Sequence, residues 1–132
     1  MTILVGMDIQ EIDEVRTSIE IFGDRYIRRV YTDYEIDDCY ENATGAAPAL
    51  AGRFAAKEAV HKILKDSDGV VTWKEIEVRR LKSGHTDIIL RGGAAELASR
   101  LGIAAISLSL SHNGRAATAV VVAESSTGSG DR

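Results

Sequence analysis

The sequence predicts an α+β domain in which a mostly antiparallel sheet packs against one long helix. Two segments support this fold class. Residues 106–111 alternate apolar and polar side chains and are followed by an Asn-Gly dipeptide at 113–114 and an apolar segment at 116–123, which is typical of a β-hairpin. Residues 46–65 are rich in alanine and other helix-forming residues, which indicates a long helix. Because the expected strands and helices do not alternate strictly along the chain, an α+β arrangement is favoured over a parallel βαβ fold.

The N-terminal third should contain one strand and two helices. Residues 3–9 form a short apolar run that carries Asp8 near its end, as a buried strand would. Residues 11–22 place apolar side chains three and four positions apart, the spacing of an amphipathic helix. Residues 32–35 match a capping box, so a second helix should begin there and end around residues 42–45.

The third and longest helix is expected over residues 46–65. Pro48 fits its first turn, where the missing N–H of proline costs nothing. Residues 65–69 should then form a loop. The helix offers the core these apolar side chains: Leu50, Phe54, Val60, Ile63 and Leu64.

The second half of the chain should form two pairs of strands with a helix between them. Strands are expected at residues 75–79 and 86–91, and a short helix at residues 94–101. The hairpin follows, with strands at residues 106–111 and 116–123. The expected order is therefore one strand, three helices, two strands, one helix and two strands.

Length and composition restrict the function classes. The 132 residues fit one domain, expected over residues 1–124, and the polar segment 125–132 should be disordered. A net charge of −4 and an aromatic content of 5% disfavour nucleic-acid binding, which needs a basic surface and stacking side chains.

No apolar run approaches the roughly 18 residues of a membrane helix. The N-terminus lacks a basic signal-peptide start. A lone Cys39 forms no internal disulfide, so we expect a soluble cytoplasmic protein.

Three charged side chains are candidates for chemistry. Glu58 and Lys62 lie four positions apart in the long helix and therefore share a face. They form either an ordinary surface ion pair or a carboxylate and an ammonium that face a phosphorylated ligand. Because burial of a lone carboxylate is costly, Asp8 either ends its strand at the surface, caps the N-terminus of a helix, or binds a hard cation. Asp8 and Glu58 together would suit Mg²⁺, which takes one or two carboxylates plus waters and phosphate oxygens.

The remaining polar groups carry weaker signals. His112 ends a strand lined by serines, where a histidine is usually solvated or caps the strand. A Ser/His hydrolase is disfavoured because the chain has no Gly-x-Ser-x-Gly elbow. The chain also lacks the G-x-x-x-x-G-K-[ST] phosphate loop of many nucleotide hydrolases. Cys39 has no activating pattern around it and is expected to be structural.

Three segments, in this order, resemble motifs of one known family. They are VGMDI at residues 5–9, LAGRFAAKEA at residues 50–59 with Lys62 beyond it, and SLSLSH at residues 107–112. With them the chain resembles, over residues 3–123, the small holo-acyl-carrier-protein synthases of the 4′-phosphopantetheinyl transferase superfamily. The helix motif is the most specific of the three.

The resemblance implies an enzyme that moves the 4′-phosphopantetheine arm of coenzyme A to a serine of an apo acyl carrier protein. It implies that Asp8 and Glu58 hold Mg²⁺. It implies that Glu58 and Lys62 are catalytic: Glu58 would help to remove the serine proton, and Lys62 would neutralise a phosphate oxygen. It further implies that Arg53, Lys62 and His112 bind coenzyme A, and that the protein is a homotrimer with its sites at the subunit interfaces.

Two other functions stay open at the level of the sequence. One is a non-catalytic trimeric homologue that acts as a binding or assembly module. It is favoured by the two acids in the loop at residues 65–69 and by Glu14, where the family often has arginine. The other is an unrelated small α+β ligand-binding protein. The carrier could serve fatty-acid or polyketide biosynthesis, and the sequence does not distinguish these pathways.

Overall fold

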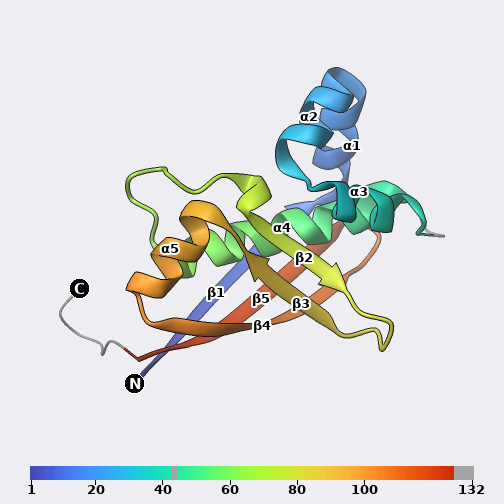
Figure 1. Ribbon diagram of the computed structural model, residues 1–132. Helices are drawn as coiled ribbons and strands as arrows, with labels where there is room; N and C mark the ends of the chain where they lie inside the picture. Colours follow the sequence, from blue (N-terminus) through green and yellow to red (C-terminus); the bar gives the residue numbers. More distant parts are fainter. Residues whose placement is uncertain (43–44, 127–132) are drawn as a thin grey trace.

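The computed structural model describes residues 1–42 and 45–126, which form two antiparallel sheets and the helices around them (Figure 1). The strands are β1 Thr2–Glu11, β2 Ile76–Arg80, β3 Thr86–Leu90, β4 Ile103–His112 and β5 Ala116–Ser125. The helices are α1 Ile12–Phe22, α2 Asp24–Val30, α3 Asp33–Tyr40, α4 Ala46–Leu64, α5 Gly92–Arg100 and the short 3-10 helix η1 Trp73–Glu75. The predicted α+β class is confirmed.

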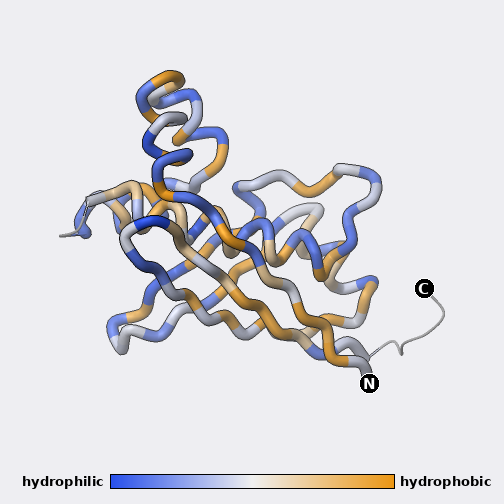
Figure 2. Tube along the Cα trace, turned by 180° about the vertical axis from the view of Figure 1, so that it is seen from behind, coloured by the Kyte–Doolittle hydropathy of each residue, from blue (hydrophilic) through white to orange (hydrophobic). Residues whose placement is uncertain are grey.

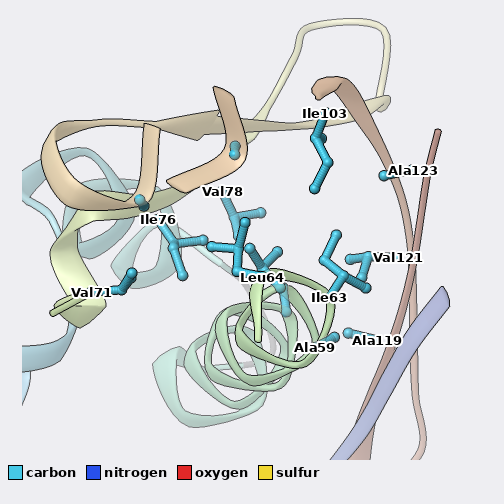
Figure 3. Close-up of a cluster of buried hydrophobic side chains, with 14 of the residues drawn as sticks. Ala59, Ile63, Leu64, Val71, Ile76, Val78, Ile103, Ala119, Val121 and Ala123 are labelled. Atoms are coloured by element: carbon cyan, nitrogen blue, oxygen red, sulfur yellow. The ribbon is translucent and has the colours of Figure 1, made fainter. Parts of the chain in front are cut away.

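Helix α4 is the centre of the molecule. The three-stranded sheet, in the order β1-β5-β4, packs on one side of α4, and the β2-β3 sheet contacts another side. Figure 3 shows α4 nearly end-on: side chains of β5 such as Val121 approach it from one direction, and Ile76 and Val78 of β2 from another. Because so much of its surface is covered, α4 buries 13 of the 18 residues from Ala47 to Leu64.

A second apolar cluster joins the N-terminal helices to the first half of α4. Ile12 and Val15 of α1 pack with Ile27 and Val30 of α2 and with Leu50 of α4. Helices α1 and α2 stand away from the sheets as a separate projection (Figure 1). Their outer side chains are therefore free to meet another molecule.

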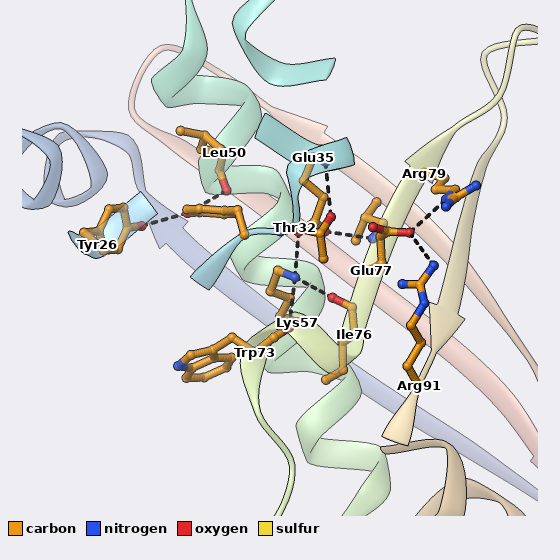
Figure 4. A network of polar contacts seen from close by, with 12 residues as sticks. Tyr26, Thr32, Glu35, Leu50, Lys57, Trp73, Ile76, Glu77, Arg79 and Arg91 are labelled. Atoms are coloured by element: carbon orange, nitrogen blue, oxygen red, sulfur yellow. Dashed lines mark hydrogen bonds and ion pairs between the residues drawn. The ribbon is translucent and has the colours of Figure 1, made fainter. Parts of the chain in front are cut away.

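A buried ion pair ties α3 to α4. The Nζ atom of Lys57 lies 2.8 Å from Oε1 of Glu35, and neither side chain has any exposed surface. Lys57 also donates to the carbonyl oxygens of Trp73, at 3.0 Å, and of Ile76. Glu35 in turn accepts the backbone N–H of Thr32. Figure 4 shows that this one ammonium connects α3, α4, η1 and the start of β2.

The structure differs from the sequence-based expectation in three places. Helix α2 was not predicted: Gly23, at a positive φ of 55°, ends α1, and a new helix begins at Asp24. The expected sheet is divided in two, since β3 and β4 lie near each other without pairing. Strand β5 extends to Ser125, one residue past the expected domain end, and residues 127–132 lie outside the described residues.

The described residues also test the expectations for the capping box, for Cys39 and for membrane helices. The capping box at Thr32 and Glu35 is present, with both hydrogen bonds formed. Cys39 is buried, and burial raises the pKa of its thiol to about 11, so it has little thiolate character. None of the helices in the described ranges combines the length and hydrophobicity that a membrane crossing requires.

Replacing Lys57 by Met should destabilise the fold strongly. The change leaves the Glu35 carboxylate buried without its cation, which typically costs about 3–5 kcal/mol. Urea denaturation should show this loss in the free energy of unfolding. Lys74 is exposed, so Lys74→Met serves as the control and should change the free energy by less than about 0.5 kcal/mol. Equal stability of the two variants would contradict a structural role for the Lys57–Glu35 pair.

Candidate functional site

The first group of predicted site residues meets where α4 crosses β1. The Nζ atom of Lys62 donates to Oδ1 of Asp8 at 3.2 Å and to the carbonyl oxygen of Met7 at 2.7 Å. Asp8 is largely covered, with 20% of its side chain exposed, whereas the Lys62 side chain is 54% exposed. Lys62 therefore pairs with Asp8 across the two elements. The ion pair to Glu58 that the helix spacing alone allowed is not formed.

Gly6 is the reason that β1 and α4 come so close. A Cβ atom at this position would lie 2.3 Å from the carbonyl oxygen of Ala59 and 3.1 Å from the side chain of Ile63. Only glycine fits such an approach of two backbones. Asp8 lies two residues after Gly6 and therefore points to the same face of β1. The close contact at Gly6 thus places the Asp8 carboxylate on the side of α4 that carries Glu58 and Lys62.

Glu58 has a raised pKa. Partial burial is the main cause, the nearby Asp8 carboxylate adds to it, and Lys62 opposes it. Two carboxylates that repel each other at a half-open surface, with an ammonium beside them, suit a hard cation and an anionic ligand together. No group of three or more potential metal-ligating side chains converges anywhere in residues 1–42 and 45–126. A cation held by Asp8 and Glu58 would therefore take its other ligands from water or from a bound molecule.

The second group lies in a separate cavity of about 100 Å³. Arg53 and Arg80 contribute to its walls, together with His112 at the end of β4. Three side chains with cationic or ionisable nitrogen atoms thus surround one small space, which suits an anion. The side chain of Arg53 is nearly covered, at 3% exposed, and its guanidinium pairs with Asp38 of α3.

The two groups lie on opposite sides of α4. Arg53 and Lys62 are separated by about two and a half helical turns, so their side chains leave the helix in opposite directions. Strand order gives the same result, because Asp8 is on the edge strand β1 and His112 is on β4 at the other edge. In one chain, the structure brings Asp8, Glu58 and Lys62 together, and it brings Arg53 and His112 together, but it does not merge the two sets.

Sequence reasoning missed two features near these sites. Asp38 was not singled out, although the acids at positions 35 and 38 share one face of α3 and the cations at positions 53 and 57 share one face of α4. The second feature is a cavity of about 250 Å³ on the projecting helices, lined by Phe22, Arg25, Tyr26 and Arg29. The sequence showed the arginines, but it did not show that aromatic side chains lie beside them.

Comparison with known proteins assigns a family. The sequence model of the 4′-phosphopantetheinyl transferase superfamily matches residues 4–121. The holo-[acyl-carrier-protein] synthase of Chlamydia trachomatis is 41% identical over 121 residues, which is 91% of this chain and 98% of that protein.

Solved structures of similar fold include two coenzyme A complexes. The holo-[acyl-carrier-protein] synthase of Helicobacter pylori in complex with coenzyme A superposes with a TM-score of 0.79 at 27% identity, covering 92% of this chain and 100% of that one. The ACPS–CoA complex from Chronobacterium ammoniagenes gives a TM-score of 0.81 at 28% identity, covering 95% and 98% of the two chains.

Substitution of Gly6 by Ala should separate β1 from α4. The added methyl group overlaps the Ala59 carbonyl, and overpacking of this kind typically costs about 1–3 kcal/mol. The free energy of unfolding should fall accordingly in urea denaturation. Gly114→Ala is a matched control, since a Cβ there meets nothing within 4 Å. A Gly6→Ala protein as stable as the control would refute the close-approach argument.

Proposed function

Because this chain belongs to the 4′-phosphopantetheinyl transferase superfamily, we propose that it is a holo-acyl-carrier-protein synthase. It transfers the 4′-phosphopantetheine arm of coenzyme A to a serine of an apo acyl carrier protein and releases 3′,5′-ADP. One observation in the structure carries the proposal: Asp8, Glu58 and Lys62 converge at the crossing of β1 and α4. Phosphoryl transfer depends chiefly on positioning and charge neutralisation, which such a set of groups supplies.

The side chains at this crossing fit Mg²⁺. Two carboxylates are close enough for Asp8 to raise the pKa of Glu58, and Mg²⁺ typically binds one or two carboxylates and fills its remaining positions with water and phosphate oxygens. Asp8 and Glu58 would hold the ion against the diphosphate of coenzyme A. When bound, Mg²⁺ supplies positive charge that offsets the negative charge developing on the phosphate oxygens.

The chain's own groups account for the remaining steps. The serine hydroxyl of the carrier attacks the phosphorus that bears the pantetheine, and the bond from that phosphorus to the bridging oxygen breaks. The bridging oxygen leaves with 3′,5′-ADP. Lys62, more than half exposed, can turn from Asp8 to neutralise a phosphate oxygen. Glu58 accepts the serine proton directly or through water.

A shared site accounts for the second group of residues. Arg53 and His112 match family positions that contact the nucleotide phosphates, yet in one chain they lie across α4 from Lys62. We propose a homotrimer in which one coenzyme A spans two neighbouring chains. The outer face of the large sheet supplies an apolar contact surface, and four side chains of β1 on it are at least half exposed: Ile3, Val5, Met7 and Ile9. Figure 2 shows hydrophobic residues along the part of this strand next to the N-terminus.

The carrier protein docks on the projecting helices in this proposal. Carrier proteins are generally acidic, and Arg25 and Arg29 flank a cavity whose other lining residues are Phe22 and Tyr26. Cations around an apolar centre suit an acidic, amphipathic helix. Arg28 lies 3.7 Å from Asp33, but its side chain is 66% exposed and can also meet the carrier.

A lone buried thiol fits the reducing cytoplasm, where we place the protein.

Intact-mass analysis tests the proposed reaction. With coenzyme A, Mg²⁺ and an apo carrier, the wild type should add one phosphopantetheine to the carrier, and a chelator should stop the gain. Asp8→Ala and Glu58→Ala should each slow transfer about a hundredfold or more, because several kcal/mol of charge stabilisation are lost. Glu96 is exposed on α5, and Glu96→Ala is the matched control. Coenzyme A binding without any mass gain would instead support the non-catalytic homologue.

Light scattering tests the trimer. Val5 is 64% exposed in the single chain, so Val5→Glu should leave the monomer folded but place three charges in the proposed interface. We expect a wild-type particle of three chains and a monomeric variant that has lost transfer activity. Val70 is 54% exposed and lies outside the sheet, so Val70→Glu should remain trimeric. A trimeric Val5→Glu protein would rule out this face as the interface.

A further inference from the structure

The Asp38–Arg53 pair joins α3 to the wall of the cavity that Arg53, Arg80 and His112 line. Nη2 of Arg53 donates to Oδ2 of Asp38. The Arg53 side chain is 3% exposed, whereas that of Asp38 is 28% exposed. A guanidinium covered to this degree is costly unless an acid accompanies it. Asp38 therefore compensates the charge of a residue whose proposed partner is a ligand phosphate.

The pair also leaves part of the guanidinium without a partner. An arginine side chain carries five N–H donors in a planar fork. Asp38 accepts from the Nη2 end, while Nε is buried and has no hydrogen-bond partner. A buried donor without an acceptor costs free energy. Because Arg53 lines the cavity with Arg80 and His112, an anionic oxygen bound there is the acceptor that these groups suit.

We propose that Asp38 is a positioning residue for coenzyme A, acting through Arg53. It holds the guanidinium against α3 so that the cavity receives the phosphomonoester on the ribose of coenzyme A, separately from the diphosphate at Asp8 and Glu58. This inference rests on the proposed function, since it requires coenzyme A as the ligand. The family motifs indicate no site residue on α3. Through Asp38, this helix nevertheless determines how well the cavity recognises that phosphate.

Calorimetric binding of two ligands tests this role. Dephospho-coenzyme A lacks only the phosphomonoester, so the ratio of its Kd to that of coenzyme A reports the cavity alone. The wild type should prefer coenzyme A. In Asp38→Ala this ratio of Kd values should be about tenfold smaller than in the wild type, as expected when a hydrogen bond to a charged group is removed. Its Kd for dephospho-coenzyme A should stay at the wild-type value, which a general disturbance of the fold would not allow.

Two further variants separate orientation from other effects. Asp38→Asn keeps an oxygen that accepts from Nη2 and should retain most of the preference. Asp37 is the exposed neighbour of Asp38 on α3, so Asp37→Asn removes an acid from the same helix and should change nothing. Arg53→Gln alone should lose the preference for coenzyme A. Adding Asp38→Ala to Arg53→Gln should change nothing further, because Asp38 then has no guanidinium to orient.

Three results would overturn the proposal. The first is an unchanged preference in Asp38→Ala, and the second is an equal loss of affinity for both ligands. The third is tighter coenzyme A binding by both Asp38 variants, which would mean that the carboxylate repels the phosphate. Transfer is measured separately by the mass of the carrier. A wild type that binds coenzyme A with this preference but transfers nothing would refute the proposed function and leave the role of Asp38 supported.

Discussion

The buried ammonium of Lys57 is the contact on which the arrangement around α4 depends. It compensates Glu35 and ties down the carbonyl oxygens of Trp73 and Ile76, so α3, η1 and the start of β2 are all fixed to one side of the helix. Burial lowers the pKa of Lys57, and Glu35 opposes that shift. The opposite side of α4 is then left to face β1, where the strand approaches at Gly6. The rotation of α4 about its own axis is set by these two contacts together.

That rotation explains why two groups of charged side chains leave α4 in different directions. Glu58 and Lys62 leave α4 toward Asp8, and Arg53 leaves it toward Asp38 and the cavity that holds His112. A single chain therefore keeps the two groups apart, with the helix between them. In the proposed trimer, contact through the apolar face of β1 would let one ligand meet both groups, so the quaternary structure would form part of the binding site.

Much of the fold could be predicted from local patterns, whereas the partners of charged residues could not. The capping box at Thr32, the hairpin after His112 and the long helix follow from rules that act within a few residues. The pairing of Lys62 with Asp8 depends on a contact between residues far apart in the sequence. Helix spacing alone suggested Glu58 as the partner, and it gave no sign that Arg53 is almost covered by α3. Tertiary packing decides both.

Lys57 and Glu58 are neighbours in the sequence, but their side chains leave α4 about 100° apart and meet different partners. One inserted residue ahead of them would turn the rest of the helix by about 100°. The ammonium would then leave its buried acid, and a carboxylate would swing toward the core. Substitution of one residue changes the contacts of one side chain only. Insertion or deletion of one residue rotates every residue after it and changes all of their contacts at once. Over evolutionary time, insertions and deletions should therefore be confined to connecting segments such as residues 65–72, while α4 keeps a constant number of residues.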